Sequence, residues 1–475
     1  MSATIEAGEA PRADNRYTRG LAEFAAGLRY ERLPGEVVAR LKLLVLDSLG
    51  CALYGAGLPW CRLLRETLLA QDATRTHPVW GTAERLSALN AALANGTQVQ
   101  GFELDDVHRH GVLHVGAVTL PALLAVAGMR PGMSGRDLVT AAVAGYEVGP
   151  RVGICMGQEH IGQGWHSGAT VGVFSAAAAA AAALGLDAGR TVHALGIAGT
   201  QAAGLMAAQY GAMVKRMHAG RSSQSGLLAA LLAERGFTGI VDVFESPYGG
   251  FCTTFSRSTD RFRLDALTEG LGDFFETMRV SLKFYACVGT NHTALDSLRN
   301  IQARRPFGPD DVHEIVVHGS QVTVDHAGWP YRPEGPTSAQ LNMRYCIATL
   351  LLEGDVFVDQ FTDGCETNPQ RIALAERVRV EHDPAITALG SAHRHKVRVR
   401  VELRDGSMHE ETVETPRGSE RRFASEADVV AKFDKLTRGM LGENQRDALA
   451  SAVLSMERLE DASRLPQLLA ASSRV

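Results

Sequence analysis

Residues 209–226 read QYGAMVKRMHAGRSSQSG and set four potential cations between long apolar flanks. The four are Lys215, Arg216, His218 and Arg221. A cation that is buried among apolar helices is costly unless an anion pairs with it. The stretch therefore favours an anion-binding floor that receives a carboxylate or a phosphate. The alternative is a solvated helix end whose basic residues complement the helix dipole, but the uncharged flanks favour the binding site.

The segments on both sides of this stretch predict a helical domain. Residues 188–208 and 222–235 are apolar segments of helical character, and residues 167–184 are almost wholly small and uncharged. Residues 35–54 carry apolar side chains at helical spacing. Ser134 is expected to cap a helix that runs through the glycines of GYEVGPRVG. No segment before about residue 275 alternates in the way a strand does.

The pattern changes after that point. Four segments have strand composition, namely residues 314–319, 377–382, 396–403 and 409–414, with a turn signal at 404–406. Helical segments alternate with them at residues 292–304, 338–353 and 368–376, and helical character returns over 425–471. We therefore expect a mainly α fold, in which a large helical domain, residues 16–278 and 421–475, is interrupted by a smaller α+β lid domain, residues 279–420. Residues 1–15 are expected to be disordered.

Composition excludes several classes of function. The chain has 475 residues and a formal net charge of −5, so no basic excess suggests nucleic-acid binding. Its seven cysteines lack CxxC spacing, which indicates reduced thiols and neither a disulfide framework nor a zinc site. The N-terminal residues lack the apolar core of a signal peptide, and the most apolar run, residues 176–186, is too short to span a bilayer. We expect a cytoplasmic protein with no membrane partner.

A dense polar cluster occupies residues 103–110, which read ELDDVHRH and are followed by His114. Histidine titrates near neutral pH, and neighbouring carboxylates orient it, so the cluster first suggests acid/base chemistry. A polar loop between helices is the second interpretation, and a metal site the third. The spacing matches no zinc pattern, HExxH included.

Residues 162–168 read GQGWHSG and place His166 just before the small-residue helix. We expect Ser167 to cap that helix. Because Trp165 and an uncharged helix flank His166, a pocket histidine is favoured over an exposed histidine in a capping loop. The sequence GQGW is not GxSxG, so it does not indicate a serine hydrolase.

A third cluster lies where the helical region gives way to the inserted domain. Residues 282–287 read LKFYAC, and His292 follows. Lys283 could reach a cleft between domains, where ligand sites concentrate, or could lie on the surface over neighbouring aromatic rings. Cys287 has no paired base nearby in sequence, so we interpret it as a packing residue.

These stretches and their order resemble the MmgE/PrpD family, which includes 2-methylcitrate dehydratase, cis-aconitate decarboxylase and iminodisuccinate epimerase. The matching elements are NGTQVQGFELDDVHRHGVLHVGAVTLPALLAVAG, GYEVGPRVG, GWHSGATVGVFSAAAAAAAALGLD, YGAMVKRMHAGRSSQSGLLAALLAERGFTGI, LKFYACVGTNH and TSAQLNMRYCIATLLLEGDVFVDQF. The resemblance implies a large helical domain with a smaller α+β lid, a homodimer, and small di- or tricarboxylate substrates. It also implies catalysis without a metal or an organic cofactor.

The resemblance also implies which residues form the pocket. They are Asp105 or Asp106 with His114, then His166, then Lys215 with Arg216 and His218, then Lys283, with Tyr331 or Tyr345 from the lid. Decarboxylase members read D-F-D-D-T where this chain has Glu103-Leu104-Asp105-Asp106-Val107, and the loop before His114 is one residue longer. Many members have a histidine where this chain has Cys287. These differences weigh against a cis-aconitate decarboxylase.

Family chemistry depends on removal of a proton from a carbon next to a carboxylate. We expect His166 and His114 to form the acid/base pair, with Asp105 or Asp106 as orienting group or base, and Lys215, Lys283 and Arg221 to bind substrate carboxylates. The first expectation is a hydro-lyase similar to 2-methylcitrate dehydratase, acting on a 2-hydroxy di- or tricarboxylate. An epimerase or isomerase of a related diacid comes second, a decarboxylase third, and a non-catalytic binding protein last.

Overall fold

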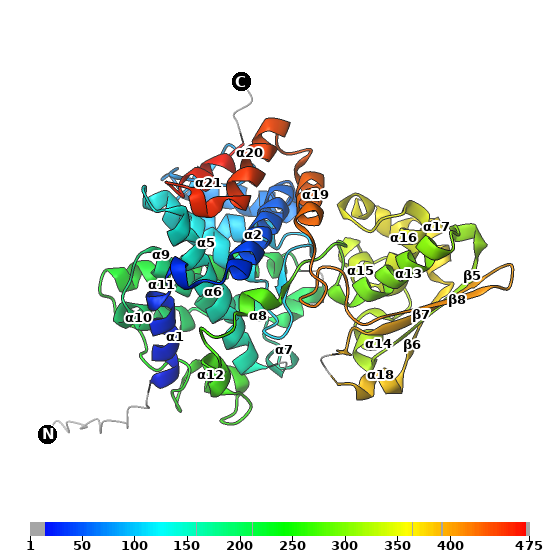
Figure 1. The fold of residues 1–475 in the computed structure, drawn as a ribbon, viewed down its shortest axis with the longest axis horizontal. Helices are drawn as coiled ribbons and strands as arrows, with labels where there is room; N and C mark the ends of the chain where they lie inside the picture. The colour runs from blue at the N-terminus through cyan, green and yellow to red at the C-terminus, as the bar shows by residue number, and fades with distance from the viewer. Residues whose placement is uncertain (1–14, 158, 211, 363, 391–392, 472–475) are drawn as a thin grey trace. The chain divides into compact units, whose positions relative to one another are not determined.

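The computed structural model describes residues 15–471 apart from 158, 211, 363 and 391–392. The disorder expected for residues 1–15 falls, except for residue 15, outside this range. The fold is mainly α-helical, as the sequence predicts (Figure 1). The chain divides into a helical unit, residues 1–101, 106–280 and 433–475, and a mixed unit, residues 102–105 and 281–432. That the mixed unit acts as a lid stays a prediction.

Helix α11 (Val214–Glu234) contacts α4, α5, α9 and α10 in the helical unit. Helices α5 and α9 are apolar on all sides and almost wholly buried, as central helices must be. The bounds are α1 (Arg16–Gly27), α2 (Gly35–Gly55), α3 (Pro59–Gln71), α4 (Ala88–Val99), α5 (Val115–Met129), α6 (Gly135–Met156), α7 (Glu159–Gly162), α8 (Ser167–Thr170), α9 (Gly172–Ala183), α10 (Ala188–Gly199), α12 (Phe251–Ser256), α20 (Glu443–Leu454) and α21 (Arg464–Leu468), while α19 (Glu426–Thr437) crosses the boundary between the units.

Glycine allows α11 to approach its neighbours closely. A Cβ atom added at Gly220 would lie 2.1 Å from the carbonyl oxygen of Leu93 in α4, and one at Gly226 would lie 2.4 Å from Cβ of Ala176 in α9. Neither distance is sterically allowed, so only glycine fits at these two positions. The abundance of small residues in the sequence therefore reflects closely packed helices.

Three local expectations for the helical unit need correction. Helix α11 begins at Val214, eight residues before the expected start, so it includes the basic stretch. The small-residue segment forms two helices, α8 and α9, with Val171 between them. Short strands also occur before residue 275, where none is expected: β1 (His77–Pro78) pairs with β2 (Arg85–Leu86), and β3 is Val107–His108. A further two-residue strand, β4 (Val280–Ser281), follows. Two residues are too few to give an alternating pattern.

The cap predicted at Ser134 is confirmed. Its hydroxyl accepts a hydrogen bond from the backbone N–H of Asp137, and the Asp137 side chain accepts one from the backbone N–H of Ser134. This reciprocal arrangement is a capping box, which satisfies two donors at the start of α6. The glycines of GYEVGPRVG lie inside α6, as the sequence predicts.

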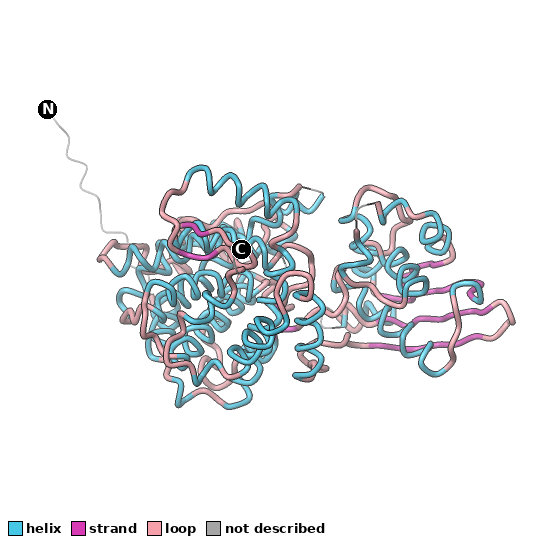
Figure 2. The backbone as a smooth tube through the Cα atoms, turned by 90° about the horizontal axis from the view of Figure 1, so that it is seen from above, coloured by secondary structure: helices cyan, strands magenta, loops and turns pink. Residues whose placement is uncertain are grey.

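The mixed unit contains a four-stranded sheet of order β6-β5-β7-β8 (Figure 2). Strand β5 (Val312–Gly319) is parallel to β6 (Val378–His382) and antiparallel to β7 (Val397–Leu403), which pairs with β8 (Met408–Val413). These four strands confirm the predicted ones. Valines of β7 are buried and its arginines face the other side, with α13 (His292–Arg304) packed on β7 and β8.

The remaining helices of this unit are α14 (Gln321–Ala327), α15 (Pro336–Leu341), α16 (Met343–Glu353), α17 (Pro369–Ala375) and α18 (Pro384–Ala388). The single helix expected over residues 338–353 is two helices, because Asn342 caps α16 by accepting the backbone N–H of Tyr345. None of the helices in the described part of the chain combines the length and the apolar character that a membrane crossing requires.

Candidate active site

Two histidine rings meet inside the helical unit. Nδ1 of His166 lies 3.0 Å from Nδ1 of His218, with ring centroids 5.0 Å apart. Their exposed fractions are only 7% and 6%. His166 itself is the N-cap residue of α8, which corrects the expectation that Ser167 caps this helix, and its backbone N–H donates to the carbonyl oxygen of Gly204 at 3.1 Å. The predicted pocket histidine is therefore buried beside a second histidine from α11.

The four basic residues of the opening stretch lie in different surroundings. Lys215 is half-buried, Arg216 is buried with its guanidinium 6.0 Å from the ring centroid of Trp60, and Arg221 is exposed and donates to Gln224 on its own helix. Successive residues of a helix point about 100° apart. The helix therefore separates the directions of Lys215 and Arg216, and the substrate-binding roles of Arg216 and Arg221 stay predictions.

The position of these residues along α11 excludes the alternative reading of the stretch as a helix end that complements the dipole. Lys215 and His218 belong to the first two turns, at the N-terminal end, where the helix dipole is positive. The first turn contains no acidic residue, and no side chain caps it. Cations at this end add to the positive potential, so an anion is the favourable partner. Burial and the charge of Lys215 both lower the pKa of His218.

Asp106 holds the start of α5. Its two carboxylate oxygens accept the backbone N–H of Gly116 at 2.9 and 3.2 Å, and the hydroxyl of Tyr146 donates to it at 3.1 Å. Both side chains are fully buried. Burial, followed by the charge of Asp106, raises the pKa of Tyr146 well above its usual range. These contacts hold the first turn of α5, whose N-cap residue is the half-buried His114.

A second buried pair fixes the other side of the loop that carries His114. Nε2 of His108 lies 2.8 Å from the carboxylate of Glu276, while its Nδ1 accepts the backbone N–H of Gly111 at 2.9 Å. His108 also exchanges two backbone hydrogen bonds with Leu113. Within this loop Val112 has a φ of +49°, which is strained for a β-branched residue. The sequence shows His108 but gives no sign of its partner, which lies far along the chain.

A hydrogen-bonded chain from His160 through Thr170 reaches the backbone carbonyl of His166. Nε2 of His160 is 2.7 Å from the hydroxyl of Thr170, and that hydroxyl donates to the carbonyl oxygen of His166 at 3.3 Å. Burial lowers the pKa of His160 to about 4, so the ring is neutral near pH 7. His160 is a further residue that motif reasoning passes over, because its role depends on a helical neighbour ten residues away.

The mixed unit holds its own ion pair. Nζ of Lys283 lies 3.3 Å from a carboxylate oxygen of Glu103, and both residues are buried. Glu103 has a φ of +55°, a left-handed conformation that is uncommon for a residue with a side chain and that clusters at functional sites. The ammonium of Lys283, expected to bind a substrate carboxylate, is thus neutralised by a carboxylate of the protein in this structure.

The segment that carries Glu103 is held at a second point. Nζ of Lys432 donates to the carbonyl oxygen of Leu104 at 2.8 Å, and Lys432 also lies over the ring of Phe284. The next residue, Asp105, is fully buried. Its role as catalytic or orienting carboxylate stays a prediction.

The predicted tyrosines of the mixed unit lie together. The rings of Tyr331 and Tyr345 have centroids 4.5 Å apart. The hydroxyl of Tyr331 donates to the carbonyl oxygen of Glu366, and the hydroxyl of Tyr345 donates to that of Cys365 and accepts from Arg371. Both hydroxyls therefore have partners within the unit, and substrate binding by Tyr331 stays a prediction.

Cys287 is a packing residue, as the sequence predicts. Its side chain is fully buried, and burial raises the pKa of the thiol well above its usual range, with further contributions from Cys346. A thiol of raised pKa is a poor nucleophile because little thiolate forms. All seven cysteines are buried.

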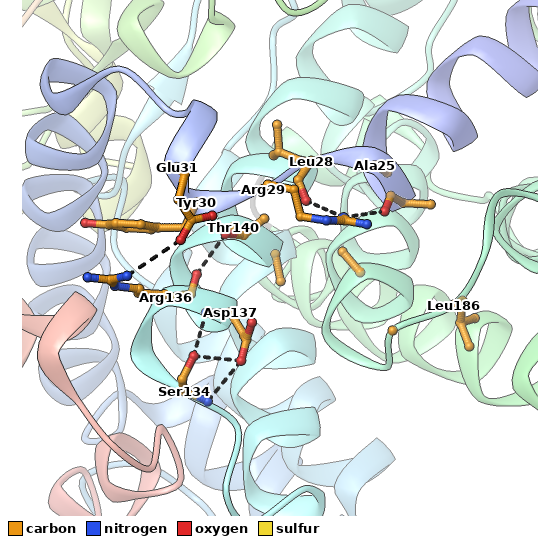
Figure 3. Close-up of a pocket in the computed structure, with 14 residues that line it drawn as sticks. Ala25, Leu28, Arg29, Tyr30, Glu31, Ser134, Arg136, Asp137, Thr140 and Leu186 are labelled. Atoms are coloured by element: carbon orange, nitrogen blue, oxygen red, sulfur yellow. Dashed lines mark hydrogen bonds and ion pairs between the residues drawn. The ribbon is translucent and has the colours of Figure 1, made fainter.

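The open hollow of Figure 3 is lined by none of the expected site residues. Across the described residues, no three side chains of His, Cys, Asp or Glu gather as metal ligands would. The hollow has a volume of about 520 Å³ and lies in the helical unit beside the start of α6. Arg136 on the wall of the hollow forms an ion pair with Glu31 and stacks on the ring of Tyr30. The guanidinium of Arg136 therefore already has partners within the protein.

Comparison with known proteins extends over both units. Residues 19–263 match the MmgE/PrpD N-terminal domain, and residues 285–458 match the MmgE/PrpD C-terminal domain. A cis-aconitate decarboxylase-like protein, oryM, from Aspergillus oryzae is 34% identical over 96% of this chain and 98% of its own length. Cis-aconitate decarboxylase from Aspergillus terreus is 32% identical over 95% of both chains, and that of Mus musculus 27% identical over 95% of this chain and 93% of its own. The chain therefore belongs to the MmgE/PrpD family of enzymes.

Proposed function

We propose that this enzyme is a lyase that needs no cofactor and removes carbon dioxide from cis-aconitate or a close tricarboxylate analogue. The observation that carries the proposal is the full-length similarity to proteins named as cis-aconitate decarboxylases. It reverses the order expected from motif differences, which placed a dehydratase first. The difference at Glu103 is conservative, since glutamate keeps a carboxylate at the position where decarboxylase members have aspartate.

The residues supply what the reaction needs. When carbon dioxide leaves, the bond between the departing carboxylate and its carbon breaks, and the electron pair forms a new double bond. The electrons of the old double bond then take a proton, which we assign to Nε2 of His166. Lys215 and the N-terminal end of α11 stabilise a remaining carboxylate as charge develops next to it.

Dehydration of a 2-hydroxy tricarboxylate such as 2-methylcitrate is the second candidate. Two differences support it: Val107 stands where decarboxylase members have threonine, and Cys287 stands where many family members have histidine. In that reaction His166 or His114 would remove the proton next to a carboxylate while the partner delivers a proton to the departing hydroxide. An epimerase would use the same proton removal and return the proton to the other face.

One experiment separates these reactions. The purified enzyme is incubated in deuterated water with cis-aconitate, 2-methylcitrate and iminodisuccinate in turn, and each mixture is followed by proton NMR. A decarboxylase converts cis-aconitate to a product with a new methylene group that carries one deuterium. A dehydratase forms an alkene only from 2-methylcitrate, and an epimerase exchanges a substrate hydrogen without elimination. No reaction and no exchange with any of the three would contradict the proposal.

We further propose the assembly and location that the family resemblance implies, a cytoplasmic homodimer formed through the helical unit. The chain mass is 50.9 kDa, so a dimer has twice that value. Sedimentation at micromolar concentration distinguishes the two, and a monomeric mass would contradict the dimer.

A further inference from the structure

The two buried imidazoles, His166 and His218, are close enough to be a single chemical unit. Their Nδ1 atoms are 3.0 Å apart, which is a normal hydrogen-bond distance. Each neutral imidazole has one N–H and one lone pair, so one Nδ1 must carry the hydrogen and the other must accept it. Two protonated Nδ1 atoms at this distance would repel each other.

We propose that His218 is a positioning residue, which shares one Nδ1 proton with His166 and thereby sets its tautomer, and is not a binding group for the substrate carboxylate. This inference rests on the acid/base role proposed for His166. It replaces the expectation that His218 contacts the substrate.

The shared proton couples the outer nitrogens of the two rings. Whichever ring donates from Nδ1 has a lone pair at Nε2 and can act as a base, while the other ring carries its hydrogen at Nε2. When His166 gains a proton at Nε2, it becomes an imidazolium whose Nδ1–H bonds to neutral His218. A hydrogen bond from a charged donor is stronger than one between neutral groups. His218 therefore stabilises the protonated state of His166, from which the proton passes to substrate carbon.

The surrounding helices fix this geometry. His166 is held by its backbone at the start of α8, and His218 lies on the second turn of α11. Gly204 lies against α8 beside the pair: a Cβ atom there would clash with Cβ of Ala169 at 2.2 Å and would lie 3.4 Å from Nε2 of His218. A larger residue at 204 would displace α8, whose N-cap residue is His166, so glycine at this point helps to keep His166 in place.

The charges nearby limit the unit to one extra proton. Lys215 on α11 is a cation one turn away and disfavours a charge on His218. His160 on α7 is linked to the backbone carbonyl of His166 through the hydroxyl of Thr170, and it stays neutral near pH 7. Two imidazolium rings 3.0 Å apart beside a lysine would be strongly repulsive. The pair therefore holds one extra proton and not two.

The shared proton is measurable without any substrate. In enzyme labelled with ¹⁵N histidine, NMR should detect scalar coupling between two ring nitrogens across an N–H···N hydrogen bond. The coupling should vanish in His218→Phe, which keeps a ring but no nitrogen, and should persist in His193→Asn. His193 lies on α10, away from the pair, and hydrogen-bonds Gly239. Absence of coupling in the wild type would overturn the inference, whatever the substrate proves to be.

Kinetics with cis-aconitate then separate positioning from substrate binding. His218→Phe should lower kcat by about 10- to 100-fold, which corresponds to one hydrogen bond to a charged group, with little change in KM. His218→Asn places an amide oxygen where Nδ1 was and should recover part of the loss. A variant that raises KM and leaves kcat unchanged would overturn the inference and restore a carboxylate-binding role. If cis-aconitate is not a substrate, the proposed function fails while the NMR result still decides the inference.

Discussion

A carboxylate oxygen of Glu103 lies 3.3 Å from the ammonium nitrogen of Lys283, and both side chains are buried in the mixed unit. The pair joins positions that are 180 residues apart in sequence. The backbone of Glu103 is in the left-handed conformation, with a φ of +55°. The ion pair joins the two segments of the mixed unit, residues 102–105 and residues 281–432.

The first prediction concerns this pair. Glu103→Gln leaves the buried charge of Lys283 without its anion, and breaking such a pair costs about 3–5 kcal/mol. We expect a lower thermal midpoint for Glu103→Gln and for Lys283→Met. The double variant should be less destabilised than the sum of the single variants, because no lone charge remains. Additive effects in calorimetry would show that the two side chains do not interact.

The second prediction concerns Lys215. We propose that Lys215, at the positive end of α11, binds a substrate carboxylate, and a hydrogen bond to a charged group is worth about 1.5–3 kcal/mol. Lys215→Ala should keep the fold, shown by an unchanged thermal midpoint, and raise KM about 10- to 100-fold. Arg235→Ala, an exposed residue at the opposite end of the same helix, is the matched control. An unchanged KM in Lys215→Ala removes this lysine from the site.

The third prediction tests His108 as a positioning residue for His114. Asparagine at 108 can still accept the N–H of Gly111 but cannot reach Glu276, whereas glutamine can reach Glu276 but not accept from Gly111. We expect both variants to lower kcat more than they change KM, because the loop that carries His114 loses one of its two anchors. Each variant's fraction of folded enzyme is measured by circular dichroism. Full turnover in both variants would assign His108 to stability alone.

The fourth prediction concerns pH and the buried ring of His160. Its folded pKa, about 4, is below the ordinary value of 6.5, so the neutral ring stabilises the fold above pH 6.5. That stability is lost as the pH falls from 6.5 towards 4, by about 3 kcal/mol in total. His160→Gln keeps a donor for Thr170 but cannot titrate. Urea unfolding at a series of pH values should show a flatter acid limb in this variant; identical slopes would contradict the buried neutral state.

The elements that could be predicted from sequence are those whose signal is local. The alternation of valine and arginine over residues 396–403 identified β7, and the uncharged small residues identified the central helices. The start of α11 was missed because Lys215 and Arg216 interrupt its apolar pattern. The burial of each cation depends on which face of α11 it occupies and on which helices pack against that face. The sequence does not show those neighbouring helices.

The sequence indicates candidate site residues but not which of them contact one another. His166 and His218 were both recognised, but their contact joins two helices 52 residues apart and could not be read from spacing. Asp106 was expected near the chemistry, and the structure shows its oxygens occupied by Gly116 and Tyr146. His108 and Glu276 are 168 residues apart, so their pairing also emerged only from the fold.

The most direct measurement compares wild type with His166→Asn on cis-aconitate in deuterated water, followed by proton NMR. Asparagine keeps some hydrogen bonding but cannot titrate, so we expect turnover to fall by about two to four orders of magnitude, the usual contribution of one acid/base group. KM should change much less, because Lys215 remains. The wild-type product should carry one deuterium, delivered to carbon through His166. Wild-type turnover in the variant, with the same deuterium in the product, would contradict this account and transfer the acid/base role to His114.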